Sequence, residues 1–176
     1  GKDSDCLRLE SFGALRFEGL TIQNCRYGLR PISCDELTVQ DCKFLKCGAP
    51  AVPGNHNGSL SQPDQSGGAL RVDTSLGLVR ILDNVVEYCF RGIRVADSVK
   101  GGLIRGNVVS QTAESGIYLS SSTYDGANGC QNFVVSENHM NQCANNSILQ
   151  IGGRNNTVSG NLCRNGFNSG VQCWSV

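Results

Sequence analysis

The chain has 176 residues, enough for one domain with a sizeable core. Its 15 basic and 15 acidic residues cancel, which argues against a nucleic-acid partner, because binding phosphates requires a basic excess or a basic face. No apolar run approaches the roughly 18 residues that a membrane-spanning helix needs, so we expect no membrane insertion.

A short motif, apolar-polar-small-Asn, recurs along the chain. It ends at Cys25 in LTIQNC and at Cys42 in LTVQDC, where Cys takes the place of Asn, and then at four asparagines. These anchors are Cys25, Cys42, Asn84, Asn107, Asn138 and Asn161. Their separations of 17, 42, 23, 31 and 23 residues predict a repeat of about 23 residues with one shortened turn and two insertions.

Apolar residues keep fixed places around these anchors. β-branched residues stand three positions before each one: Ile22, Val39, Ile81, Ile104, Val135 and Val158. Apolar residues stand two positions after each one: Tyr27, Phe44, Val86, Val109, Met140 and Cys163. We expect both rows to point into the core.

A second apolar alternation follows the first in most repeats. It is GALRV from Gly68, GIRV from Gly92, GIYL from Gly116, SILQI from Ser147 and GVQC from Gly170. No unit shows a 3.6-residue period, so each repeat is predicted to be a pair of short strands separated by turns. Such strands, stacked about 4.8 Å apart, predict an all-β solenoid of about six to seven coils. An Asn row at a turn can bond the backbone and the Asn of the next coil, and it tolerates left-handed dihedral angles. The rival β-propeller needs units of about 40 residues with four strands each.

The pattern apolar-x-Gly-Asn-x-apolar followed by Ser-Gly-Ile-x-apolar resembles the repeats of right-handed parallel β-helix proteins, the pectate-lyase-like superfamily. The resemblance covers roughly Leu20 to Val176. It implies a fold and not one activity, because the superfamily includes polysaccharide lyases, glycoside hydrolases, alginate epimerases and phage tailspikes. We expect one β-helix domain over residues 1–176, taken from a longer chain, with loop insertions at 48–68 and 120–130.

Outward positions of the second strand form the candidate binding surface. We expect a stripe in which long donors, an aromatic ring and amides stack from coil to coil: Arg71, Arg94, Tyr118, Gln150 and Gln172, with Trp174 beside them and Tyr124 in the flanking insertion. Arg16 in GALRFE echoes Arg71 in GALRVD. Guanidinium and amide groups grip sugar hydroxyls and carboxylates, while aromatic rings stack on sugar faces. The alternative is that the stripe is an ordinary polar strand face, with its arginines paired to neighbouring acids.

The acids near this stripe are the candidate catalytic residues. Glycoside hydrolysis requires two carboxylates about 5–9.5 Å apart, and the candidates are Asp73, Asp97 and Asp125, of which the first two stand one coil apart. A structural role for each is the alternative. The resemblance also implies lyase chemistry, in which an Arg or Lys serves as base and carboxylate-bound Ca²⁺ neutralises a uronate. Arg94 beside Asp73 and Asp97 is the nearest imitation, but no lyase motif matches residue by residue.

The ten cysteines include no paired CxxC knuckles, so zinc is not expected. We predict rows of buried thiols, one with Cys25 and Cys42 and another with Cys47, Cys89 and Cys143. A disulfide between Cys25 and Cys42 is the alternative. No cofactor is expected, except Ca²⁺ if the protein is a lyase.

Together these features predict a β-helix domain that binds, and could cleave, a cell-surface polysaccharide, most like part of a phage tailspike. We expect a homotrimer, located at a virion tail or outside the cell. Buried thiols suit assembly in a reducing cytosol, and the low net charge suits a neutral glycan. The alternatives are a fragment of a secreted polysaccharide lyase or alginate-type epimerase, and a non-catalytic structural or adhesion module.

Overall fold

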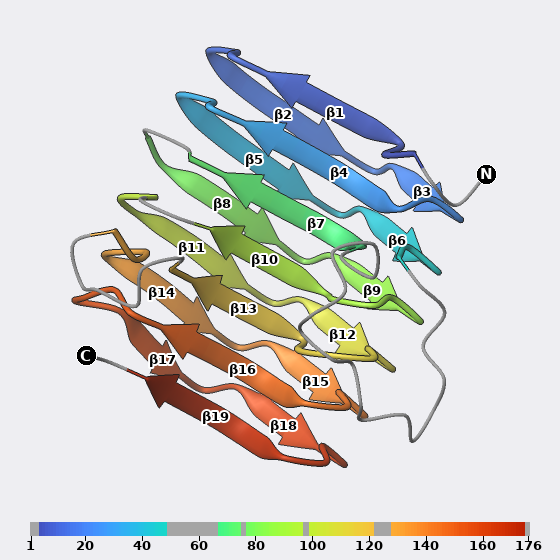
Figure 1. Cartoon of the computed structure of the whole chain (residues 1–176), viewed down its shortest axis with the longest axis vertical. Coiled ribbons are helices and arrows are strands. Elements are labelled where there is room, and N and C mark those ends of the chain that lie inside the picture. The colour runs from blue at the N-terminus through green and yellow to red at the C-terminus, as the bar shows by residue number, and fades with distance from the viewer. Residues whose placement is uncertain (1–3, 49–66, 75–76, 97–98, 122–127, 175–176) are drawn as a thin grey trace.

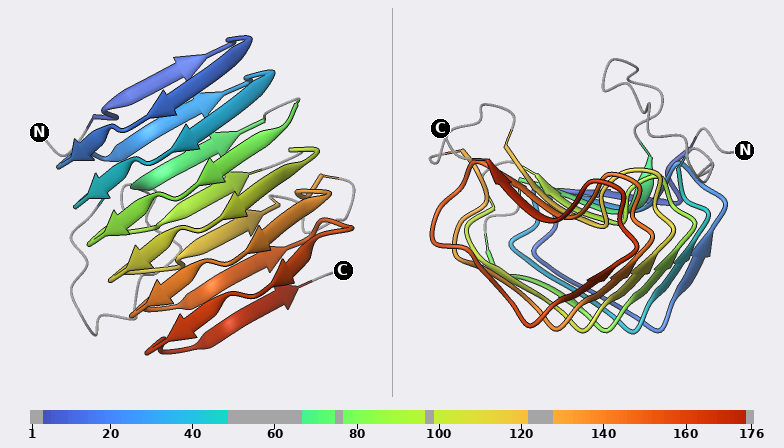
Figure 2. Two further views of the ribbon diagram at one scale, coloured as in Figure 1. Left: turned by 180° about the vertical axis from the view of Figure 1, so that it is seen from behind. Right: turned by 90° about the horizontal axis from the view of Figure 1, so that it is seen from below.

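The computed structural model describes residues 4–48, 67–74, 77–96, 99–121 and 128–174. Its strands form three parallel sheets that wind together as one β-helix (Figure 1). Viewed end on, the coils outline a three-sided cross-section (Figure 2). No helix in the described ranges is long and apolar enough to cross a membrane.

Each coil contributes one strand to each sheet. Sheet A contains β1 Leu7–Glu10, β4 Tyr27–Ile32, β7 Gly68–Asp73, β10 Ile93–Ala96, β13 Ile117–Ser120, β16 Asn146–Ile151 and β19 Ser169–Trp174. Sheet B contains β2 Ala14–Glu18, β5 Glu36–Gln40, β8 Val79–Leu82, β11 Gly102–Arg105, β14 Phe133–Ser136 and β17 Thr157–Ser159. Sheet C contains β3 Thr21–Gln23, β6 Lys43–Leu45, β9 Val85–Glu87, β12 Val108–Ser110, β15 His139–Asn141 and β18 Leu162–Arg164.

The predicted all-β solenoid is confirmed, but a coil holds three strands instead of two. The first alternation of each repeat bends at its anchor, so that β8 lies before Asn84 and β9 after it. The left-handed conformation falls on the residue before the anchor, for example Asp83 at φ 54° and Gly106 at φ 71°, and not on the Asn that was expected to adopt it. One left-handed residue turns the chain sharply enough to start a new sheet.

The anchor asparagines form the predicted ladder. The backbone N–H of Asn84 donates to Oδ1 of Asn107 at 3.0 Å, and Asn107 repeats the contact to Asn138 at 3.0 Å. The side-chain Nδ2 of Asn107 also donates to Oδ1 of Asn138 and to the carbonyl of Ile81 in the preceding coil. The amides of Asn84, Asn107 and Asn138 therefore each join three consecutive coils at a corner that is shielded from water.

The first anchor was misplaced. Ile22 lies opposite Phe44 in the pairing of β3 with β6, so Cys25 lies opposite Cys47 and not in the row of Cys42. Leu20 takes the anchor place, because Lys43 donates to its carbonyl as Val85 donates to that of Cys42. Leu20 and Cys42 are 22 residues apart, so the first coil is of ordinary length and the shortened turn does not exist.

Two further assignments change with that anchor. Phe17, not Ile22, stacks with Val39 in the row before the anchors. Ile22, not Tyr27, belongs to the row after them. The error arose because TIQNC and TVQDC look alike although they stand at different corners.

Apolar side chains fill the inside in the predicted rows. In sheet B, Val39, Ile81, Ile104 and Val135 are fully buried, and Val158 in the last coil is partly buried. In sheet C, Phe44, Val86, Val109 and Met140 continue the core. The long interruptions fall between β6 and β7 and between β13 and β14, at the two predicted insertions, of which residues 49–66 and 122–127 lie outside the described ranges.

Candidate functional site

The outward face of sheet A carries one position that repeats through all seven strands. Register pairing places Arg8, Arg30, Arg71, Arg94, Tyr118, Leu149 and Gln172 at it, and we call this set the outer row. Alternation within each strand sends the neighbouring residues, such as Ile93 and Val95, into the core. The outer row therefore displays guanidinium groups over the N-terminal coils and Tyr118 and Gln172 over the C-terminal ones, with the nearly buried Leu149 between these two.

The predicted stripe is correct for Arg71, Arg94, Tyr118 and Gln172 but shifted at β16. Leu149 lies opposite both Tyr118 and Gln172, whereas Gln150 lies opposite Leu119, which belongs to the core. Gln150 donates instead to the carbonyl of Gly152 at 3.2 Å. A slip of one residue moves a side chain to the other face of a strand, so Gln150 leaves the stripe.

Two arginines of the outer row were missed in the sequence, and Arg16 was compared with this row although it lies on another sheet. Arg8 and Arg30 stand between apolar residues in LRLE and LRPI, just as Arg71 stands in ALRVD, and this shared pattern was the available signal. Arg16 in GALRFE lies in β2 of sheet B, opposite Thr38, and therefore not on this face.

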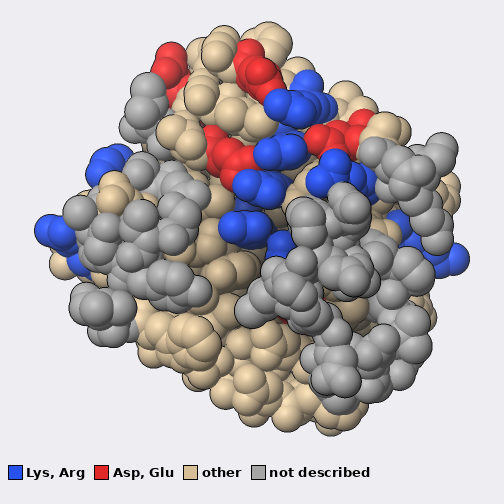
Figure 3. Space-filling model, in the orientation of Figure 1, with Lys and Arg blue, Asp and Glu red and all other residues tan. Residues whose placement is uncertain are grey.

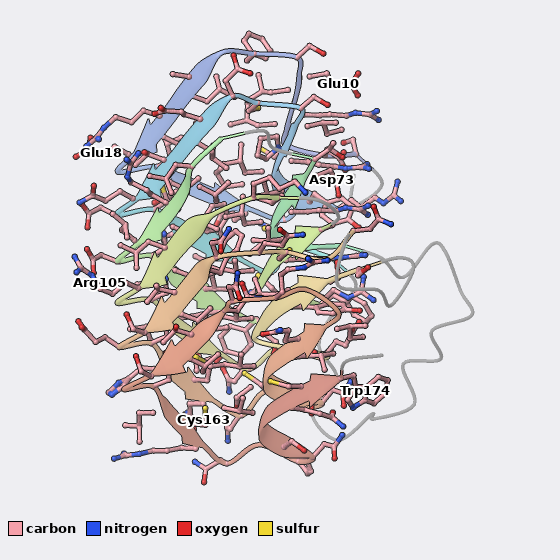
Figure 4. The ribbon with its side chains drawn as sticks, turned by 90° about the vertical axis from the view of Figure 1, so that its left-hand side faces the viewer. Glu10, Glu18, Asp73, Arg105, Cys163 and Trp174 are labelled. Carbon is pink, nitrogen blue, oxygen red and sulfur yellow. The ribbon has the colours of Figure 1, made fainter. Side chains whose placement is uncertain are left out.

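A second outward position lies beside the outer row. It holds Glu10, Ile32, Asp73, Ala96 and Ser120 in successive strands, and Trp174 at the C-terminal end opposite Ile151. In β16 this position is occupied by Ile151. A prediction that places Gln150 in the outer row would put Gly152 here instead. In Figure 4, Glu10, Asp73 and Trp174 lie on one side of the molecule, and Glu18 and Arg105 of sheet B lie on the opposite side. Ala96, Ser120 and Ile151 are buried, so this second position reaches the surface only at Glu10, Ile32, Asp73 and Trp174.

Asp73 holds two arginines of the outer row. Its Oδ1 accepts from Nε of Arg71 at 2.7 Å, and its Oδ2 accepts from Nε of Arg30 at 3.2 Å. Burial by itself would lower the pKa of Arg71, but the hydrogen bond and the charge of Asp73 outweigh burial and raise that pKa. Both oxygens of this candidate catalytic acid are therefore occupied by cations, which favours a positioning role for Asp73.

Tyr27 lies beneath this group. Its ring lies between 5.4 and 5.7 Å from the guanidinium carbons of Arg26, Arg30 and Arg71, and its hydroxyl accepts from Arg71 at 3.2 Å. A nearly buried aromatic ring surrounded by cations holds their planar groups in fixed orientations. This part of the face is therefore a pre-organised array of donors.

Arg94 occupies a different environment one coil further on. Its Nε donates to the hydroxyl of Ser120 at 3.2 Å, and its guanidinium lies 5.4 Å from the ring centre of Tyr118. Burial and the positive charges of Arg71 and Arg91 lower the pKa of Arg94. Within the described ranges, no carboxylate lies within 4.0 Å of Arg94.

Arg91, at the corner before β10, is neutralised locally. Its Nε donates to Glu114 of the next coil, and both side chains are about nine-tenths buried. Figure 3 shows the basic side chains gathered across the middle of the face of sheet A, with acidic ones beside and above them and an uncharged surface over the C-terminal coils.

A family model described as a right-handed beta helix region matches residues 3–175. The chain belongs to the right-handed β-helix family. In separate searches, no curated protein and no solved structure matched it. The family settles the hand of the coil and agrees with the three parallel sheets, but it does not specify a ligand.

The remaining candidate residues of this right-handed β-helix were Asp97, Asp125 and Tyr124, which lie outside the described residues. Among the residues that are described, no group of three or more His, Cys, Asp or Glu side chains is arranged to hold a metal ion. Within the described part of the chain, the candidate site is therefore the outward face of sheet A, which offers hydrogen-bond donors and aromatic rings.

The ten cysteines of the β-helix are thiols and form no disulfides. Cys25, Cys47 and Cys89 stack in successive coils, with 3.6 Å between the sulfur atoms of Cys25 and Cys47. Burial, with a smaller contribution from Cys47, raises the pKa of Cys25 to about 12. These thiols are packed as part of the core, as the sequence predicted, although in a different row for Cys25.

Proposed function

We propose that this β-helix binds a polysaccharide along the outer row of sheet A, as a tailspike-like domain that recognises a cell-surface glycan. The observation that supports it is the register of the outer row, where donors and an aromatic ring take one position in consecutive coils about 4.8 Å apart. A sugar chain is itself a repeating ligand with hydroxyl groups on its ring edges and C–H groups on its faces. Guanidinium groups suit the edges, and Tyr118 and the half-exposed Trp174 suit the faces.

Ten cysteine thiols without disulfides support the tailspike-like setting. Proteins assembled in a reducing cytosol keep their thiols reduced, whereas secreted enzymes more often contain disulfides. A homotrimer on a virion tail or in the extracellular space belongs to the same proposal. Mass mapping of the non-reduced protein tests this setting, because disulfides would favour a secreted lyase or epimerase instead.

Cleavage of the bound glycan is the finer part of the proposal. Asp73 is held by two arginines, so a hydrolytic pair of the candidate acids would need both Asp97 and Asp125. Release of reducing ends without ultraviolet absorbance would indicate a hydrolase, and absorbance from unsaturated uronates would indicate a lyase. Binding without either product would indicate a recognition module.

The test of binding is Tyr118→Ala on a glycan array, followed by titration of the best ligand. Loss of a stacking ring should weaken binding by about 1 kcal/mol, roughly fivefold in Kd, without unfolding the chain. Tyr88→Ala is the matched control, because Tyr88 is an exposed tyrosine in the turn after β9, outside the outer row. Equal binding by wild type and Tyr118→Ala would remove the outer row as the binding surface.

A further inference from the structure

Positive charge on the face of sheet A is only partly neutralised by the described residues. Around β7 and β10 lie three guanidinium groups, those of Arg71, Arg91 and Arg94, and two carboxylates. Asp73 is bonded to Arg71, and Glu114 is bonded to Arg91. Arg30 shares Asp73 and also lies 3.8 Å from a carboxylate oxygen of Asp5, so no carboxylate of the described residues is left to pair with Arg94.

Arg94 also has unused hydrogen-bonding capacity. A guanidinium group offers five N–H donors, and among the described residues only Nε of Arg94 has an acceptor, the hydroxyl of Ser120. That hydroxyl donates its own proton to the carbonyl of Val95 at 3.3 Å, so it contributes a lone pair and no charge. The side chain of Arg94 is partly exposed, and among the described residues no acceptor bonds its terminal nitrogens.

The position of Tyr118 indicates how a ligand would be oriented at Arg94. The ring lies one coil beyond Arg94 in the outer row, and the guanidinium of Arg94 lies over it at 5.4 Å. A sugar that packs against Tyr118 would bring a substituent on its ring edge to the terminal nitrogens of Arg94. A planar guanidinium binds carboxylate and sulfate oxygens in pairs.

We propose that Arg94, flanked by Arg71 and Arg91, forms a subsite for the acidic group of a charged sugar residue, either a carboxylate or a sulfate ester. This inference rests on the proposed function and names the class of glycan that the outer row binds. It replaces the neutral glycan that the zero net charge suggested, because net charge describes the whole chain and not one face. The lowered pKa of Arg94, caused by burial and by its two cationic neighbours, is consistent with a site that a bound anion would stabilise.

The experiment compares two acidic polymers with their neutral counterparts: polygalacturonate with its carboxyl-reduced form, and dextran sulfate with dextran. We expect wild type to bind one acidic polymer at least about tenfold more tightly than its counterpart, and the polymer that binds identifies the carboxylate or the sulfate. Arg94→Gln should abolish that preference, and Arg94→Lys should retain part of it, because an ammonium keeps the charge but not the paired donors. The melting temperature of Arg94→Gln should not fall below that of wild type by more than a few degrees, since the substitution removes a partly buried cation that its neighbours repel.

Arg16→Gln is the matched control, since it removes one exposed arginine that is paired with Glu18 on sheet B. An equal loss of binding in Arg16→Gln and Arg94→Gln would overturn the subsite in favour of general attraction between charges. Equal binding of acidic and neutral polymers would overturn the subsite and leave the proposed function standing. If neither the four polymers nor an array of neutral, carboxylated and sulfated glycans is bound, the proposed function fails and the subsite with it.

Discussion

The asparagine ladder shows how much one side chain can contribute to this fold. Asn107 is fully buried, accepts from the backbone and side chain of Asn84, and donates to Asn138 and to two carbonyls. Asn107→Leu should lower the free energy of unfolding by about 3–5 kcal/mol, because buried donors and acceptors would lose their partners at about 1–3 kcal/mol each. Urea denaturation measures this loss. Asn161→Leu is the control at the C-terminal end of the ladder, where partial exposure lets water replace the lost bonds; equal losses in the two variants would contradict the burial argument.

At the same scale, sequence predicted a residue's place where its neighbours fix the register. Arg71, Arg94 and Tyr118 each follow a small residue and an apolar one, and the structure stacks them as expected. Gln150 was chosen because it is polar, although Leu149 stands at the matching position after Ser147. A single sequence does not show that an apolar residue stands at an outward position of a strand. Choosing the polar residue gave Gln150, whereas counting two positions from Ser147 gives Leu149.

The strands of sheet B test the division between inside and outside. Val135 in β14 is fully buried between Ile104 and Val158, whereas its neighbour Val134 is 39% exposed. Val135→Asp should prevent folding or cost more than about 4 kcal/mol, because it buries a charge without a partner. Val134→Asp should change stability by less than about 1 kcal/mol. Circular dichroism on heating separates the two, and a Val135→Asp variant that melts like Val134→Asp would show that the faces are reversed.

The existence of the strands was predictable, and their number per coil was not. Apolar residues at −3 and +2 around Asn84 were identified correctly, but the corner between them was not recognised as the end of a strand. The reason is local: one left-handed residue such as Asp83 turns the chain without a Gly-Pro signal or a change in composition. The first coil was displaced for a related reason, since Cys25 and Cys42 close similar pentapeptides at different corners.

For the whole molecule, the repeat fixed the architecture because every coil must bury the same rows. The period near 23 residues, the two insertions and the parallel stacking are all confirmed. The distribution of charge over the surface was harder to predict from the sequence, because a net charge of zero does not reveal the arginine-rich centre on the face of sheet A. Which charged side chains lie next to one another depends on how the strands of sheet A are stacked. That stacking depends on the strand register, which was only partly predicted.

Buried thiols couple the stability of the whole β-helix to alkaline pH. Burial raises the pKa of Cys143 from 9.0 to about 11. The folded state therefore holds this proton more tightly than the unfolded state, so its contribution to stability is complete below pH 9 and is lost as the pH rises towards 11. Between pH 8 and pH 10.5, this thiol alone should lower the free energy of unfolding by about 2 kcal/mol.

Urea titrations of the reduced protein at the two pH values measure that loss. Cys143→Ala should lose about 2 kcal/mol less than wild type over this interval, even though its stability at pH 8 is lower because a buried side chain is shortened. Cys173→Ala, which changes an exposed thiol in the last strand, should follow wild type. The comparison uses differences within each variant, so lysine and tyrosine titrations common to all three cancel. If Cys143→Ala declines as steeply as wild type, the thiol at this corner titrates as it does in the unfolded chain, and the alkaline sensitivity belongs to other groups.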